Sequence, residues 1–144
     1  SRGLGDVYKR QGYGNSSNAS SFNGYFDGNH QTITGLNVDE RGNNTDAGLF
    51  GAVSVATNEP VLKDLTIENA TIYAGDETDD GTLQYGAGVL VGSITLLGGS
   101  SAKYAAIENC HVSGQVDSKM YAGGLIGAFV LLCRQRIPLF SSTN

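Results

Sequence analysis

The sequence predicts an all-β protein, a right-handed parallel β-helix (β-solenoid) built from about three repeats. Two short motifs recur in the same order three times along the chain. Glycine is abundant, with 21 residues in 144, and it follows no collagen period, so it serves turns and close contacts. No segment has the pattern of a helix or of a β-hairpin. One repeat cannot bury its apolar face alone, whereas stacked repeats share a continuous core.

The first motif reads "ITGLNV", "IENATI" and "IENCHV", beginning at Ile33, Ile67 and Ile107. Apolar residues occupy its first, fourth and sixth positions, a spacing that a straight strand with alternating faces does not allow. Between them lie Gly35, Asn69 and Asn109, of the two residue types that most readily adopt positive φ. We therefore expect a strand, a bend and a second strand in each copy, with the Asn side chains bonded along the stack.

The second motif is a pair of apolar residues followed by glycine, and it closes at Gly51, Gly92 and Gly127. A glycine in this place predicts a sharp corner or a close approach of two backbones. The polar stretches between the motifs, Asp39–Asp46 and Gly75–Gln84, vary in length and are expected to be loops.

The first repeat opens with "FNGYFDGNHQTI". Phe22 and Phe26 are expected in the core, and Asp27–Asn29 in a tight turn. Gln31 occupies the position of Leu65 and Ala105 in the later repeats, which predicts an end coil or a local bend. A β-sandwich also fits short strands with glycine turns, but repetition of both motifs in order favours the solenoid.

Three segments are expected by composition. Residues 1–11 have the character of a non-native leader or sequencing artefact, residues 12–130 form the β-solenoid repeat domain, and residues 131–144 are a doubtful tail. The chain begins without Met and is interpreted as an internal piece of a longer protein.

Charge and hydropathy narrow the classes of partner. The net charge is −5 and no segment clusters Lys and Arg, so we expect no nucleic-acid partner. No apolar run reaches the length of a bilayer, so no membrane insertion of this segment is expected. Neither a cofactor nor a metal site is expected, because His30 and His111 are isolated from other ligands.

The motifs together resemble the GLUG-motif repeats of bacterial surface and secreted proteins. "FNGYFDGNHQTITGL", "GLFG", "IENATI", "LVG", "IENCHV" and "GGLIG" carry the resemblance over residues 22–130. Such repeats occur in adhesin-like proteins and in the non-catalytic region of immunoglobulin A1 metalloproteases. The resemblance implies a β-helix array outside the cell. The protease's zinc-binding His-Glu-x-x-His is not in this sequence, so no catalytic residue is carried over.

Other reactive side chains have structural interpretations. Cys110 aligns with Ala70 and Leu36 and is expected to pack as a small apolar residue, while Cys133 lies in the doubtful tail. Four acids in one stretch suggest either a solvated loop or a calcium site: Asp76, Glu77, Asp79 and Asp80. Four tyrosines flank the motifs and suit either sugar stacking or edge packing: Tyr73, Tyr85, Tyr104 and Tyr121.

Glu68 and Glu108 align at one outward position, with Lys63 and Lys103 each four residues before the motif isoleucine. Stacked carboxylates would suit a carbohydrate-active β-helix enzyme of polysaccharide lyase or glycosidase type. The alternative is a solvated face on which the lysines offset repulsion between the acids. Repetition favours the structural interpretation, so the expected catalytic set is empty and the chain is predicted not to be an enzyme.

The predicted function is that of a non-catalytic repeat segment of a bacterial cell-surface or secreted protein, acting as an adhesive or spacer β-helix. Its expected partners are a host glycan or protein ligand and further repeats of the same chain. The predicted location is extracellular or on the bacterial cell surface. An isolated piece of a solenoid has open strand edges, so we expect it to be marginally stable or to aggregate.

Overall fold

A computed structural model describes residues 21–43, 45–56, 58–75, 85–97 and 104–132. Within these ranges the chain is all-β. The strands are β1 (Tyr25–Thr34), β2 (Asn37–Arg41), β3 (Phe50–Val55), β4 (Val61–Gly75), β5 (Gly86–Ala87), β6 (Val91–Leu97), β7 (Ala106–Ser118), β8 (Tyr121–Ala122) and β9 (Ile126–Leu132). The predicted leader, residues 1–11, lies outside the described residues, as does most of the predicted tail. The described part of the chain contains no helix that is long and apolar enough to cross a membrane.

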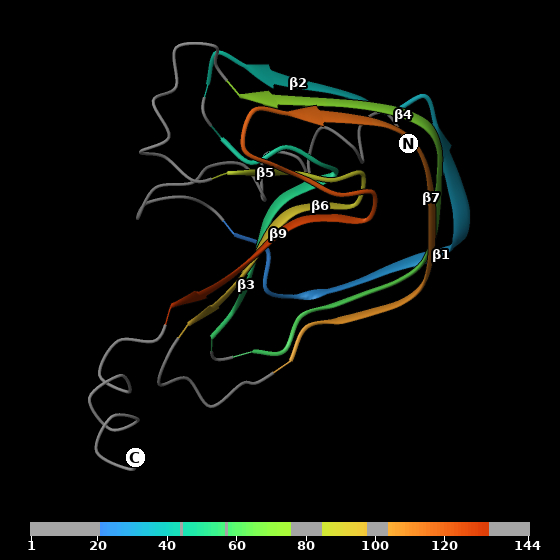
Figure 1. Cartoon of the computed structure of the whole chain (residues 1–144). Helices are drawn as coiled ribbons and strands as arrows, with labels where there is room; N and C mark the ends of the chain where they lie inside the picture. Colours follow the sequence, from blue (N-terminus) through green and yellow to red (C-terminus); the bar gives the residue numbers. More distant parts are fainter. Residues whose placement is uncertain (1–20, 44, 57, 76–84, 98–103, 133–144) are drawn as a thin grey trace, which may run out of the picture.

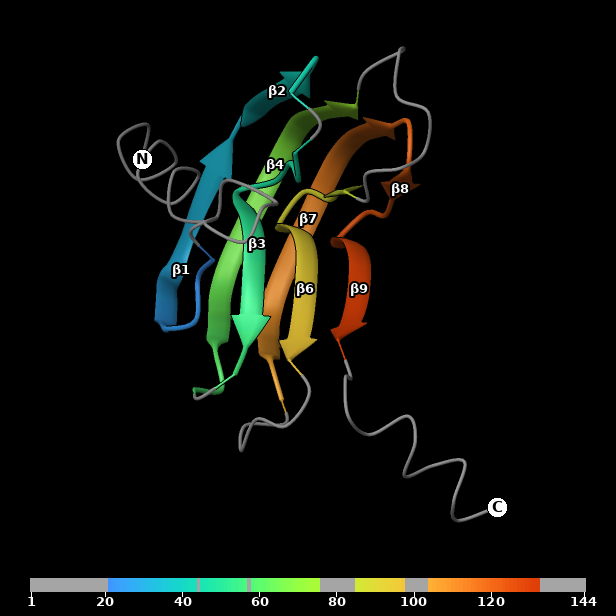
Figure 2. The same cartoon turned by 90° about the vertical axis from the view of Figure 1, so that its left-hand side faces the viewer.

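Every strand pairing among the described residues is parallel. β4 pairs with both β1 and β2 on one side and with β7 on the other, β6 lies between β3 and β9, and β5 pairs with β8. Figures 1 and 2 show the two larger sheets facing each other. The all-β prediction is confirmed, and the parallel pairing is compatible with a β-helix but not with an antiparallel β-sandwich.

The strands divide into three successive layers, which we name the first (β1–β3), second (β4–β6) and third layer (β7–β9). Each layer contributes to the two larger sheets in the same order, and the second and third layers also form the β5–β8 pair. The first motif behaves as predicted in the first two layers. Ile33 pairs with Ile67, and Thr34 with Glu68. The predicted bends have φ of 76° at Gly35 and 56° at Asn69.

The register of the third layer differs from the predicted alignment. Ile107 pairs with Leu62 rather than Ile67, and Val112 pairs with Ile67. The cause is that the motif's apolar spacing occurs twice within β4, at Leu62, Leu65 and Ile67 and again at Ile67, Ala70 and Ile72. The alignment of the two "IEN" segments, at residues 67–69 and 107–109, therefore predicted the wrong one of these two registers.

Asn109 accordingly bends the chain at a different corner from Asn69, although its φ of 52° is positive as predicted. It lies between Glu108, which pairs with Lys63, and Cys110, which pairs with Leu65, so its neighbour is Asp64. The expected Asn ladder is absent at this place. Instead, the Asn109 side-chain amide donates to Asp64 Oδ1 at 2.9 Å.

The glycines of the second motif serve close backbone approach rather than positive φ. A Cβ on Gly92 would lie 2.5 Å from the carbonyl oxygen of Gly51 and 2.8 Å from the amide nitrogen of Ala47. A Cβ on Gly127 would lie 2.5 Å from the amide nitrogen of Ala87. Only glycine lets these segments pack so closely, which confirms one of the two predicted roles.

The first predicted loop, Asp39–Asp46, is wrong at both ends. Asp39, Glu40 and Arg41 belong to β2, because Val38 and Glu40 alternate inward with exposed neighbours. Asp46 is buried just before the second motif. The second predicted loop begins at Gly75, which ends β4, and the rest of it lies outside the described residues.

The core fills the space between the sheets in the first two layers. Phe22 and Phe26 lie in it as predicted, with ring centroids 4.9 Å and 5.4 Å from that of Phe50. Gln31 pairs with Leu65 as expected but is exposed, and the chain bends beside it at Asn29 and His30, whose φ values are positive.

The third layer is less well covered than the other two. Its inward residues pack against the core yet remain partly exposed; these include Ile107, Cys110, Val112, Val116, Leu125 and Ile126. Phe129 pairs with the buried Ile94 but is 71% exposed. The apolar interior is therefore open at the third layer.

Candidate functional site

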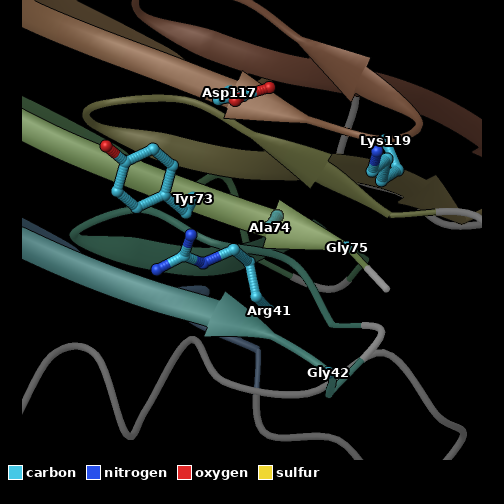
Figure 3. A pocket seen from close by; sticks show the side chains of 7 residues that line it. All are labelled: Arg41, Gly42, Tyr73, Ala74, Gly75, Asp117 and Lys119. Atoms are coloured by element: carbon cyan, nitrogen blue, oxygen red, sulfur yellow. The ribbon is translucent and has the colours of Figure 1, made fainter. Parts of the chain in front are cut away.

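A polar pocket of about 390 Å³ lies where β2, β4 and β7 end side by side (Figure 3). Register fixes its residues. Asp39, Tyr73 and Asp117 form one row across the three strands. Two rows on, Arg41 pairs with Gly75, and Lys119 follows Ser118, the partner of Ala74. Its lining is Arg41, Gly42, Tyr73, Ala74, Gly75, Asp117 and Lys119.

Arg41 is held in place from two sides. Its Nε donates to Asp39 Oδ1 at 2.8 Å, and its Nη2 donates to Asp39 Oδ2 at 2.5 Å. The guanidinium carbon lies 4.4 Å from the centroid of the Tyr73 ring, in cation–π contact. The hydrogen bonding of Arg41 to the Asp39 carboxylate is the main cause that raises the pKa of Arg41. A long cationic side chain at the surface thus has one defined position.

Gly75 provides the space between the two cationic side chains. Its φ is +106°, and a Cβ there would lie 2.7 Å from Tyr85 Oη and 2.8 Å from Cβ and Cγ of Lys119. Its carbonyl accepts the Gly42 amide at 3.0 Å, and the Lys119 amide donates to the Ala74 carbonyl at 3.3 Å. A larger residue at position 75 would collide with Tyr85 and Lys119 and strain the backbone.

A second polar cluster surrounds Asp64 at the first bend of β4, where φ is 56°. Besides Asn109, it contacts His30, with Nε2 3.8 Å from Asp64 Oδ2, and Lys63, with Nζ 3.7 Å away. The Asn109 hydrogen bond, followed by His30 and Lys63, lowers the pKa of Asp64. These contacts hold a corner together, and the described residues contain no group of three or more His, Cys, Asp or Glu side chains that could hold a metal ion.

The predicted carboxylate pair does not form. Glu68 pairs with Thr34 as expected, but Glu108 pairs with Lys63, which in turn pairs with Asp27. This row alternates in charge, so it resembles the stabilising solvated face rather than a pair of catalytic acids. Lys103 and the four acids Asp76, Glu77, Asp79 and Asp80 lie outside the described residues.

The other singled-out residues have separate positions. Cys110 is half-buried against the core, its Sγ lies 3.4 Å from the Glu108 carbonyl oxygen, and burial raises the pKa of the thiol. His111 is exposed and lies 3.2 Å from Asn109 Oδ1. Of the four tyrosines, Tyr73 alone lines the pocket. Tyr85 is buried, and Tyr104 and Tyr121 are exposed elsewhere. Cys133 lies outside the described residues.

Asp46 is a buried acid that the sequence did not single out. Its Oδ1 accepts the Gly86 amide and its Oδ2 accepts the Ser93 hydroxyl, both at 2.8 Å. Burial raises its pKa to about 6 despite these hydrogen bonds. It joins the first layer to the second, and its enclosure leaves it a structural role.

This chain is similar to a short stretch of Halomucin. The two are 34% identical over 106 residues, and Halomucin comes from Haloquadratum walsbyi (strain DSM 16790 / HBSQ001). The match covers 74% of this chain and 1% of Halomucin. No family model matches the chain. No solved structure matches it.

Sequence reasoning missed most of the pocket. Arg41 was assigned to a loop, and Asp117 and Lys119 carried no motif of their own. The available signal was the register. When Val38, Ile72 and Val116 are aligned, "VDER" after Asn37 and "VDSK" after Gln115 both align with "IYAG". The misaligned third repeat hid this correspondence.

Proposed function

We propose that the chain is a non-catalytic segment of a right-handed parallel β-helix with GLUG-type repeats, serving as an adhesive spacer in a cell-surface or secreted protein. One observation carries the proposal: three layers of parallel strands add to the two larger sheets in the same order, and the apolar residues of the last layer stay partly exposed. A closed domain buries its apolar residues within itself, whereas a segment of a repeat array leaves the apolar face of its last layer for the next repeat to cover.

The uncovered layer supports further repeats of the same type as its partner. Among the described strands β7 pairs with β4 on one side only, and the inward Val112 and Val116 stay partly exposed. A further layer placed in the same register would cover them in the way that the third layer covers Ile67 and Ile72, which are buried. It would also pair the open edge of β7, which otherwise invites association.

The similarity to a stretch of Halomucin supports an extracellular location. The chain spans about 1% of that protein's length, so the role of the whole molecule is carried over only as part of this proposal. The non-catalytic role is supported by the register, because Glu68 and Glu108 do not share a row. Replacing both with Gln and assaying polysaccharide depolymerisation tests this: an activity in the parent chain that the double variant loses would overturn it.

Duplication of the second layer tests the spacer role. Inserting two or four further copies of residues 61–105 after residue 105 leaves every existing pairing possible. Since neighbouring strands lie about 4.8 Å apart, the maximum dimension in small-angle X-ray scattering should grow by about 10 Å and about 19 Å. The melting temperature should rise with copy number. Increments of a whole domain's width, or chains that fail to fold, would overturn the stacked array.

A further inference from the structure

We propose that the pocket formed by Arg41, Tyr73, Asp117 and Lys119 binds a neutral saccharide through neighbouring hydroxyl groups. This inference rests on the adhesive role proposed above and names the chemistry that it would recognise. It is based on the arrangement of the charged side chains and the Tyr73 ring at the ends of β2, β4 and β7 (Figure 3).

The first argument is charge balance. Arg41 and Lys119 are cationic, while Asp39, which binds Arg41, and Asp117 are anionic. An anionic ligand would meet the Asp117 carboxylate and a guanidinium already paired with Asp39, and a cation would meet the guanidinium and the ammonium. A sugar hydroxyl both donates and accepts, so it matches a site that offers donors and acceptors side by side. The chain's net charge of −5 also opposes polyanionic ligands.

The second argument is preorganisation. Asp39 and the Tyr73 ring hold the guanidinium, whose bonds to Asp39 use Nε and Nη2. Its remaining N–H groups are thereby aimed without further loss of side-chain freedom, which is the main cost of ordering an Arg on binding. Asp117 is exposed on the neighbouring strand, in the same row as Tyr73, so the pocket also offers an acceptor on the other side of the ring.

The third argument is shape. Gly75 keeps the central strand bare between the two cations, and its left-handed φ and close neighbours make any side chain there unfavourable. The resulting volume of about 390 Å³ lies at the lower end of ligand pockets, the size of one or two sugar rings. The Tyr73 ring supplies an apolar wall against which the C–H groups of a sugar can pack.

The test is titration of the full chain, labelled with ¹⁵N, by neutral sugars: glucose, galactose, mannose, N-acetylglucosamine and lactose at millimolar concentration. We expect shifts of the backbone amides of Arg41, Tyr73, Asp117 and Lys119 for at least one of them. Asp117→Asn should weaken binding at least about fivefold by removing a charged acceptor. Glu108→Gln, the same neutralisation on the same strand outside the pocket, should leave the affinity unchanged.

Two results would overturn the inference. One is the absence of shifts at the pocket with every neutral sugar. The other is binding that requires glucuronate or a sulfated sugar and is strengthened by Asp117→Asn, which would identify an anion site. The layer-duplication experiment does not depend on sugar. If the chain lengthens but binds no sugar, the saccharide proposal is wrong and the spacer role stands. If the chain binds sugar but does not lengthen, the spacer role is wrong.

Discussion

Asp46 couples the stability of the fold to pH at the scale of a single residue. Its pKa of about 6 lies above its ordinary 3.8, and burial is the main cause. Between these values the folded chain holds more protons on this carboxyl than the unfolded chain does. Its contribution to stability is therefore full below about pH 4 and is lost as the pH rises through about 6, by about 3 kcal/mol.

We expect Asp46→Asn to remove this slope. Asn keeps an oxygen for the Gly86 amide and an amide group that can donate to Ser93, so its shape and hydrogen bonds fit the site. The measurement is urea unfolding of both chains from pH 4 to pH 8. The observable is the difference between the chains, because Asp64, with its lowered pKa, adds a slope of opposite sign. Parallel curves would show that Asp46 titrates normally.

Glycine substitutions separate close packing from backbone conformation. Gly92→Ala places a methyl group against two backbone segments and should cost about 1–3 kcal/mol or more. Gly35→Ala has open space but a φ of +76°, so about 1 kcal/mol is expected. Gly124→Ala meets neither obstacle and should be near neutral. Chemical unfolding ranks the three, and an equal cost at Gly92 and Gly124 would contradict the close approach.

At the scale of the strand, the sequence predicted the bends better than the register. Positive φ at Gly35, Asn69 and Asn109 follows from local chemistry, since few residue types adopt it. Register is a property of pairs of strands, and β4 offers two equivalent apolar frames to β7. The pocket depends on that register, so its row of Asp39, Tyr73 and Asp117 could not be predicted without the correct pairing of β7 with β4.

Disulfide trapping distinguishes the two registers. In a chain with Cys110 and Cys133 replaced by Ala, Lys63→Cys with Glu108→Cys should cross-link readily, since paired parallel residues lie about 4.8 Å apart. Glu68→Cys with Glu108→Cys, the pairing that the sequence alignment implied, should not. The fraction cross-linked under mild oxidation decides, read by electrophoresis without reductant. Efficient closure of the second pair alone would restore the original alignment.

At the scale of the whole molecule, the fold is asymmetric along its stack. In the first layer, Phe22 bridges to Val53 of β3 and packs its ring against Phe50. The third layer instead leaves apolar side chains in contact with solvent. The expectation of a marginal or aggregating piece therefore has a location in the structure, at the β7 and β9 edge.

We expect the chain to self-associate with rising concentration and Phe129→Glu to weaken this association. Phe129 is 71% exposed although its partner Ile94 is buried, so a charge there faces whatever covers the layer. Tyr104→Glu is the matched control, since Tyr104 is 69% exposed but lies before β7 begins. Sedimentation velocity over a concentration series measures the effect. Equal effects of the two substitutions would point to general surface charge instead.

The layered order also determines how the molecule would respond to tension. The layers run in sequence order, and among the described strands the first and third layers each contact the second. A pull on the two ends would therefore detach an outer layer while its neighbours keep their pairing. The chain from Phe26 to the equivalent Leu62 spans roughly 120 Å when fully extended, against about 4.8 Å of stack height. Such a molecule would lengthen in steps under load and dissipate force layer by layer, as an extensible tether does.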